Sequence, residues 1–260
     1  MHLNVSFMLE DFPVVLKALP VTLGLTVLSY AGAFLIACLF GAVILHKTKV
    51  LYPLILVFNT VVKGIPLLIQ LLFCYYGIPQ LLKLLSEKTD LIRYDPKHLS
   101  YFAFAAVAFS INYGAYMTDV VVSSFKAVDP GQREAADAIG MTKLQGIWYI
   151  TGLQALKISI PGLSNYFMWL LKATSLASIT NVFELLATSR ASTADNYAIL
   201  EGYIVAAAIY WAVCLIAEHL LKKLNQAMKQ EEMINEHGRT GTYQKEAWWK
   251  RNPERCEPVR

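Results

Sequence analysis

Few residues in this sequence have types and spacings that could do chemistry, and they gather in two places. One is a charged stretch at residues 126–161, and the other is an apolar run at residues 158–183 that holds several polar side chains. The five histidines are scattered without an H-E-x-x-H spacing, and no G-x-x-x-x-G-K-[ST] loop is present to hold nucleotide phosphates. We therefore expect a protein that is not an enzyme and that binds neither a metal nor a cofactor of its own.

The composition is that of a membrane protein. Hydrophobic residues make up 56% of the 260 positions and charged residues only 16%, which is too apolar for an ordinary soluble domain. The net charge of +4 is small, and the basic residues lie at the ends of apolar runs rather than on one face, so nucleic-acid binding is not expected. The four cysteines have no metal-ligand or redox spacing, so we interpret them as packing residues.

Runs of about 20 apolar residues are long enough to cross a bilayer as helices. Five such runs predict an all-α integral membrane protein with five transmembrane helices, at residues 20–45, 51–82, 99–125, 158–183 and 202–217. The second run is interrupted at Lys63, Gly64 and Pro66. A break of this kind is tolerated in a membrane only where protein or water supplies hydrogen-bond partners.

The distribution of Lys and Arg predicts the orientation. Alternating the ends of the five spans puts more of them on the side that holds the C-terminus, so we expect the N-terminus outside and the C-terminus in the cytosol. The expected organisation is an external segment at residues 1–19, a transmembrane domain at 20–224 with a cytosolic loop at 126–160, and a cytosolic tail at 225–260.

The cytosolic loop has signals for two short helices. Asp129, Pro130 and Gln132 are an N-cap, a first helical residue and a reciprocal amide, and Gly140 is expected to end that helix in a left-handed turn. Residues 142 and 145 repeat the capping-box spacing, so a second helix is expected to begin at residue 143 and to end where Pro161 removes a backbone donor.

The first of these helices carries Glu134-Ala135-Ala136, followed after three residues by Gly140. This pattern resembles the EAA signature of bacterial ATP-binding-cassette (ABC) importer permeases. The runs VVKGIPLLIQLLFCYYG, AYMTDVVVSSFKAVDPGQREAADAIG and IPGLSNYFMWLLKATSLAS also resemble the polar-amino-acid branch of that family, and the resemblance extends over residues 20–224. The chain departs from the family pattern at Leu153, Lys63, Tyr166 and Ala173, where Pro, Arg, an acidic residue and Asp are usual.

The resemblance implies a multi-pass permease subunit in the bacterial cytoplasmic (inner) membrane that moves a polar amino acid inward. It implies two ATPase subunits that use ATP, a second permease subunit that is either this chain or a paralogue, and an external substrate-binding protein. It places Glu134, Ala135, Ala136 and Gly140 in coupling to the ATPases. The alternative is an ion-coupled secondary amino-acid transporter or a membrane scaffold; a carrier of that kind commonly has inverted repeats and midplane carboxylates, and neither is found here.

Polar side chains at membrane depth are the candidates for the substrate path. Those we select are Lys63, Asn112, Asn165, Tyr166, Trp169, Lys172, Thr174 and Ser175. At helical spacing Asn165, Trp169 and Lys172 share one face, and Lys172 is expected to face water, a substrate carboxylate or a partner such as Asp119. The alternatives are structural: Lys63 reaching the interface through its stem, and hydrogen bonds between helices for the amides and hydroxyls.

Three further expectations concern residues outside this set. Asp119 is expected to cap the following loop or to pair with Lys126. The segment at residues 184–196 is expected to return to the polar external side, and the fifth span, with Tyr203, Tyr210 and Trp211, to face lipid with its aromatic rings as anchors.

Since Tyr166 replaces an acidic residue and Lys63 and Lys172 are basic, the substrate is expected to be neutral or acidic rather than cationic.

Overall fold

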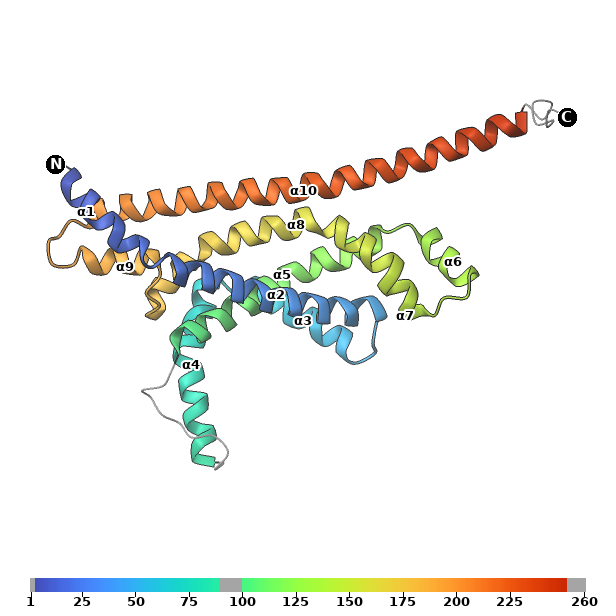
Figure 1. The fold of residues 1–260 in the computed structure, drawn as a ribbon. Coiled ribbons are helices and arrows are strands. Elements are labelled where there is room, and N and C mark those ends of the chain that lie inside the picture. Colours follow the sequence, from blue (N-terminus) through green and yellow to red (C-terminus); the bar gives the residue numbers. More distant parts are fainter. Residues whose placement is uncertain (1–2, 89–99, 252–260) are drawn as a thin grey trace. The chain divides into compact units, whose positions relative to one another are not determined.

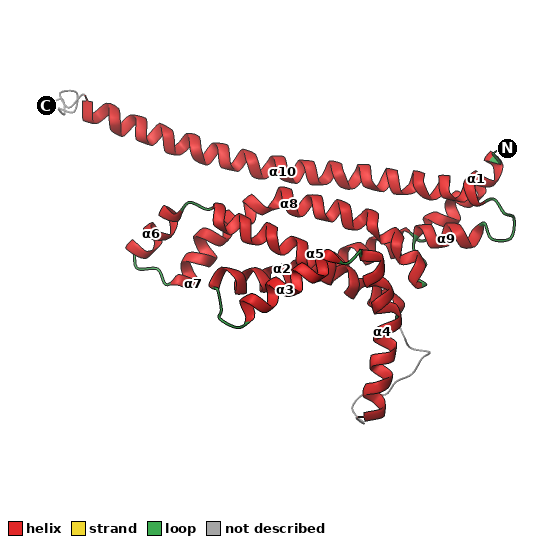
Figure 2. Ribbon diagram, turned by 180° about the vertical axis from the view of Figure 1, so that it is seen from behind, coloured by secondary structure: helices red, strands yellow, loops and turns green. Residues whose placement is uncertain are grey.

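The computed structural model describes residues 3–88 and 100–251, with side chains up to residue 228. Every element in these residues is helical (Figure 1, Figure 2). In chain order they are α1 (Val5–Leu16), α2 (Leu19–His46), α3 (Leu51–Gly64), α4 (Leu67–Lys88), α5 (Tyr101–Ala127), α6 (Pro130–Ala138), α7 (Lys143–Gly146), the π-helical turn η2 (Ile147–Thr151), α8 (Gly152–Ala173), the 3-10 helix η3 (Thr174–Thr180), α9 (Leu185–Ser192) and α10 (Ile199–Arg251).

The chain divides into two compact units, Met1–Ala217 and Glu218–Arg260. The first unit holds α1 to α9 and the beginning of α10, and all of the candidate site residues. The second unit is a helix as far as Arg251, so α10 extends through most of the predicted tail at residues 225–260. The end of that tail, residues 252–260, lies outside the described residues.

Four of the described helices are long and apolar enough to cross a membrane: α2, α4, α5 and the Ile199–Met228 part of α10. A fifth span results if Lys143–Thr180 and Leu185–Ser192, which meet at a bend of 45°, are counted as one. This agrees with an all-α membrane protein. The predicted second span proves to be two helices, the 14-residue α3 and the separate α4, because the backbone is extended at Ile65 and Pro66 cannot continue the helix.

The central helix of the first unit is α5, which packs against α2, α3, α4 and α8 (Figure 1). Small residues let α2 and α5 approach closely: a Cβ atom at Gly114 would lie only 2.8 Å from Cγ2 of Ile36. Close packing at small residues is typical of membrane helices. Because lipid tails are as apolar as the side chains, the hydrophobic effect does not drive these helices together, and van der Waals contact does. The main core, which includes Leu25, Phe109, Met117 and Leu170, forms around this contact.

The predicted external segment is an ordered helix rather than a loose end. α1 packs against α9, and its Val15 joins a second small core with Leu185, Val205 and Ile209. Asn4 caps the helix by accepting a hydrogen bond from the backbone N–H of Phe7 at 3.1 Å. The N-terminal helix therefore belongs to the folded unit.

The helix expected to end at Pro161 does not end there. The capping box of Thr142 and Gln145 begins α7 as predicted, but the chain continues through η2 into α8, which contains Pro161 and ends at Ala173. Proline is tolerated inside a membrane helix when the freed carbonyl finds other partners. The expectation was wrong because it applied the rule for soluble helices at membrane depth.

Candidate functional site

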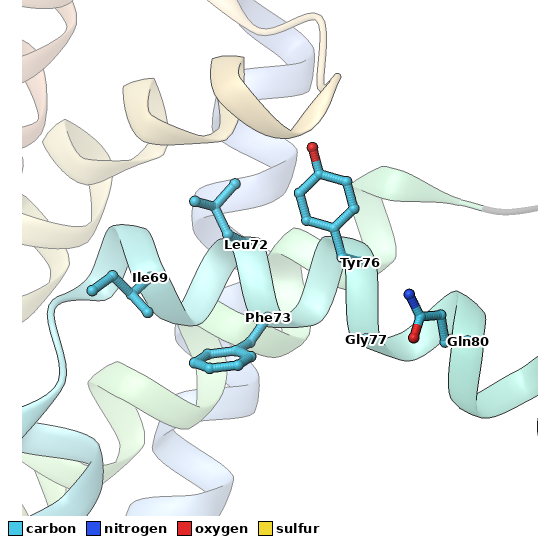
Figure 3. Close-up of a pocket in the computed structure, with 6 residues that line it drawn as sticks. All are labelled: Ile69, Leu72, Phe73, Tyr76, Gly77 and Gln80. Carbon is cyan, nitrogen blue, oxygen red and sulfur yellow. The ribbon is translucent and has the colours of Figure 1, made fainter.

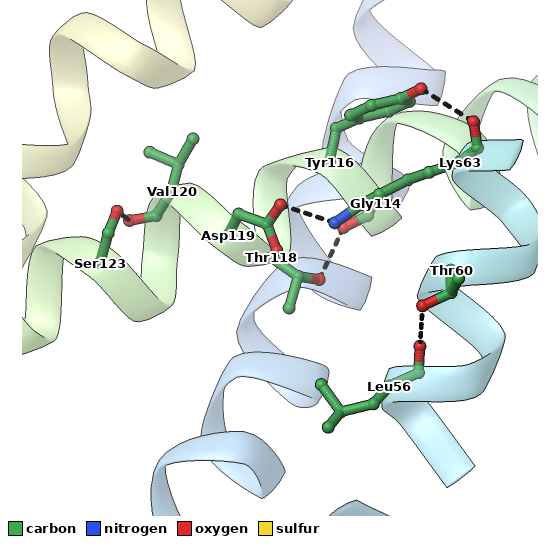
Figure 4. Close-up of polar contacts among 9 residues, drawn as sticks. All are labelled: Leu56, Thr60, Lys63, Gly114, Tyr116, Thr118, Asp119, Val120 and Ser123. Atoms are coloured by element: carbon green, nitrogen blue, oxygen red, sulfur yellow. Dashed lines mark hydrogen bonds and ion pairs between the residues drawn. The ribbon is translucent and has the colours of Figure 1, made fainter. Parts of the chain in front are cut away.

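Lys63 and Asp119 form an ion pair between α3 and α5, with 2.6 Å between Nζ and Oδ2 (Figure 4). The ammonium of Lys63 also lies 5.7 Å from the centroid of the Tyr116 ring, and the Tyr116 hydroxyl donates to the backbone carbonyl of Lys63 at 3.3 Å. The expected partners of Asp119, its own loop and Lys126, are therefore replaced by a residue 56 positions earlier. The ammonium of Lys63 is thus paired within the subunit.

The break between α3 and α4 gives Lys63 its position, and Gln70 satisfies that break. The Gln70 side chain donates to the carbonyls of Val62 at 2.7 Å and Ile65 at 2.8 Å. An unpaired carbonyl at membrane depth is costly, so one amide that bonds two of them stabilises the interrupted helix. Lys63 is thereby fixed at the end of a helix, next to α5.

A row of aromatic rings connects the ion pair to α8. Tyr166 stacks on Tyr116 with centroids 6.1 Å apart, and Trp169 meets Tyr166 edge to face at 5.3 Å. The rings therefore bring together three of the predicted path residues, Lys63, Tyr166 and Trp169. Trp169 ends the row and is 58% exposed.

The other predicted path residues separate into two groups. Asn165, Trp169 and Lys172 are exposed on α8, in agreement with a shared face, and Ser175 is half-buried. Asn112 is only 5% exposed and Thr174 is completely buried, so neither side chain reaches that face. Asp119, expected as one of the possible partners of Lys172, is bonded to Lys63.

The predicted coupling segment forms as two short helices, α6 and α7. Asp129 caps α6 through its Oδ1, which accepts from Gly131 N at 2.9 Å, and Gly140 has the left-handed φ of +79° that its position required. Glu134 and Ala135 are exposed, whereas Ala136 is 2% exposed and faces Gly146 of α7. Ala136 therefore contributes to packing within the segment.

One capping detail differs from expectation. The Gln132 side chain does not return to the N-cap; its Oε1 accepts a hydrogen bond from Gln154 Nε2 at 3.1 Å. This bond ties α6 to the beginning of α8, so the coupling segment is attached to a transmembrane helix at both ends. Next to it, Ile139 and Leu144 expose 72% and 66% of their surface, which adds apolar area beside Glu134.

Glu184 and Tyr210 bond to each other inside the first unit. Glu184 is completely inaccessible, and the Tyr210 hydroxyl donates to its Oε2. Glu184 is therefore a buried cap rather than a polar surface residue, and Tyr210 is partly buried against it, whereas Tyr203 and Trp211 of the same helix are exposed. The sequence carried no standard capping signal at this position, since Glu is not among the residues preferred at a helix N-cap.

The groove that the described residues present on α4 is not this site. It is open and apolar and is lined by Ile69, Leu72, Phe73, Tyr76, Gly77 and Gln80, all from one helix (Figure 3). None of the predicted path or coupling residues lines it. No group of three or more His, Cys, Asp or Glu that could hold a metal occurs in the part of the chain that the structure describes.

A helical membrane unit with a broken, lysine-bearing helix and a capped, glycine-ended EAA segment is the architecture of an importer permease. The chain belongs to the family of binding-protein-dependent transport system inner membrane components, whose model matches residues 18–230. It is therefore a multi-pass inner-membrane permease subunit of an ABC importer, not an enzyme, and it works with ATPase and binding-protein partners. The alternative of a self-sufficient secondary carrier does not fit this family.

Individual relatives and a solved structure support the assignment to this family. The chain is 31% identical to a probable amino-acid permease protein, YxeN, of Bacillus subtilis over 86% of this chain and 96% of the relative. It is 33% identical to the L-cystine transport system permease protein TcyB of the same organism over 82% and 86%, and 29% identical to the glutamine transport system permease protein GlnP of Escherichia coli over 88% and 99%. The crystal structure of an amino acid ABC transporter with histidines matches with a TM-score of 0.74 and 28% identity, covering 87% of this chain and all of that one.

Proposed function

We propose that this subunit moves a polar amino acid, or a close relative of one, into the cytoplasm, driven by ATP hydrolysis in two separate ATPase subunits. The similarity to amino-acid permeases supports the substrate class. The chain itself binds no cofactor in this proposal, because the nucleotide is held by the ATPases. An external binding protein delivers the substrate.

The observation that carries the proposal is the continuous group formed by Lys63, Asp119, Tyr116, Tyr166 and Trp169, which we name the ion-pair and ring group. It combines a cation, an anion and aromatic faces at the break of a membrane helix. A zwitterion presents a carboxylate and an ammonium, which this group can accept through Lys63 on one side and through Asp119 and the ring faces on the other. The exposed Asp119, at 69% side-chain exposure, is available for that exchange.

The charges of this group favour a substrate without a net positive charge. Lys63 and Asp119 compensate each other, and Lys172 on α8 adds a further, exposed positive charge. A cationic side chain that reached Lys172 would be repelled by its like charge. We therefore assign a neutral or acidic amino acid rather than arginine or lysine.

We propose that the path is completed by a second permease subunit, either a copy of this chain or a paralogue. The face of Asn165, Trp169 and Lys172 is exposed in the single chain, and an exposed lysine and amide beside a membrane helix need a polar environment. A matching face across a two-fold axis would enclose a route between the subunits. Each subunit would then offer one α6 segment to one ATPase.

Reconstitution of the assembled importer with its binding protein in vesicles tests this function. We expect uptake that requires ATP and that is inhibited by neutral or acidic amino acids such as glutamine, glutamate or cystine more than by arginine. Uptake by this chain alone, driven by an ion gradient and indifferent to ATP, would show that the proposal is wrong. Strong selectivity for arginine would refute the charge assignment but not the importer function.

A further inference from the structure

A second polar group lies between the two cores of the first unit and is separate from the ion-pair and ring group. It consists of Thr22 of α2, Thr174 of η3, Glu184 at the N-cap of α9 and Tyr210 of α10, and we name it the joint. Three of these side chains, Thr22, Thr174 and Glu184, are completely buried. Nothing in the proposed transport step uses them.

Glu184 is the centre of the joint. Its Oε1 accepts from Ala187 N at 2.8 Å, and its Oε2 accepts from Leu186 N at 3.0 Å and from the Tyr210 hydroxyl at 2.5 Å. A buried carboxyl group is costly unless donors surround it, and hydrogen bonds to a charged group in a poorly hydrated interior are strong. The joint is therefore a firm connection between α9 and α10.

The joint also fixes the end of α8. The Tyr210 oxygen, whose hydrogen goes to Glu184, lies 3.3 Å from Thr174 Oγ1, which can donate its single hydrogen either to that oxygen or to the carbonyl of Leu171 at 2.7 Å. Thr22 Oγ1 accepts from Leu185 N at 3.2 Å. Thr174 follows directly on the end of α8, two residues after Lys172 and five after Trp169. Lys172 thus lies within one helical turn of the joint and Trp169 within about one and a half.

We infer that Glu184 and Tyr210 are positioning residues for transport: they hold the last turn of α8 so that Trp169 and Lys172 face the path. This role rests on the proposed path. Helix capping alone does not account for the arrangement, because the bonds from Leu186 and Ala187 complete the cap of α9 without any tyrosine. The contact with Tyr210 is the additional element, and it is the one that connects the cap to α8 through Thr174.

Tyr210→Phe isolates that contact, because it removes one hydroxyl and leaves the ring and the cap in place. The test uses the assembled importer in two forms. A cysteine-free chain with a single cysteine at position 172 gives the rate of labelling by a small water-soluble thiol reagent, and a cysteine-free chain that keeps Lys172 gives the substrate moved per ATP. The loss of a hydrogen bond to a charged group is expected to change the labelling rate by about tenfold and to lower the transport ratio. Tyr203→Phe is the matched control, since Tyr203 lies seven residues earlier on α10 and is 43% exposed; it should change neither quantity.

Glu184→Asp is a second variant, which keeps a capping carboxylate but shortens its reach toward Tyr210. It should act in the same direction as Tyr210→Phe, and combining the two should add little, because both remove one contact. Assembled complexes of both variants that keep the parent labelling rate and transport ratio would overturn the role of the joint while the proposed path remained. A cysteine at 172 that stays unlabelled in the parent with Tyr210 intact would remove Lys172 from the path and overturn this role with it.

Discussion

Lys63 on α3 and Asp119 on α5 lie 2.6 Å apart, and this pair is the only charged contact that the described residues place at the break between α3 and α4. The Asp119 side chain is 69% exposed and that of Lys63 24%, so water screens the carboxylate and the contribution of the pair to stability is small, about 0–1 kcal/mol for exposed pairs. An ion pair that stabilises the fold so little can exchange its partners for the charged groups of a substrate.

Exchanging the two charges separates a structural pair from a substrate contact. Lys63→Asp combined with Asp119→Lys restores an ion pair, so the importer should assemble and be as stable as the parent. We expect uptake nevertheless to remain at least about tenfold below the parent, because the cation and the anion now meet the wrong ends of a zwitterion. Recovery of full uptake in the exchanged protein, measured in vesicles, would mean that the pair is structural.

Glu134→Lys should weaken the binding of the ATPase subunit to this subunit. Glu134 is exposed in the first turns of α6, where a carboxylate suits the helix dipole and can accept bonds from a basic partner. We expect the correctly inserted variant to lose most of its bound ATPase in co-purification. Retention of both bound ATPase and uptake would exclude Glu134 from coupling.

Gly140→Val tests the turn between α6 and α7. A β-branched residue at φ +79° costs on the order of 1–3 kcal/mol, although no atom crowds the site. We expect a displaced α6 and weaker ATPase binding. Gly77→Val is the control, because a Cβ there also meets nothing and the glycine has no positive φ; equal behaviour of the two variants would argue against a special turn.

Gln70→Leu should destabilise the first unit by roughly 1–3 kcal/mol for each carbonyl it leaves without a donor. The carbonyls concerned are those of Val62 and Ile65. Thermal unfolding of the detergent-purified protein measures the effect. Gln80→Leu, at an exposed position further along the same helix, should leave the transition where it was; an equal shift in both would mean that Gln70 does not satisfy the break.

Local signals predicted much of the fold and of the coupling segment. The capping residue Asp129 and the left-handed Gly140 depend only on neighbours in the sequence, and the structure has both as expected. The uncharged run at residues 20–45 likewise corresponds closely to α2, Leu19–His46. Signals of this kind determine where a helix begins and ends, and they carry no information on which helices pack against each other.

Pairings between distant residues could not be predicted in the same way. Asp119 was expected to cap the following loop or to pair with Lys126, which is near in sequence, whereas its partner Lys63 lies 56 residues away across a helix contact. Glu184 was expected in a polar external segment and Tyr210 on a lipid-facing helix, yet Glu184 is completely buried and the Tyr210 hydroxyl donates to it. Only the tertiary arrangement decides whether such a group faces water, lipid or a partner.

The central claim is that the face of Asn165, Trp169 and Lys172 lines the substrate path, and cysteine labelling tests it most directly. Single cysteines at these positions, in a chain without Cys38, Cys74, Cys214 and Cys256, would be treated with a small water-soluble thiol reagent in the assembled importer. A cysteine at Leu35, which is 61% exposed on the apolar α2, is the control for exposure to lipid.

We predict that the three path positions are labelled, that substrate slows the labelling, and that the cysteine at 35 stays unreactive. Lack of labelling at all three positions in a protein that still transports would contradict the account and leave these residues with a packing role.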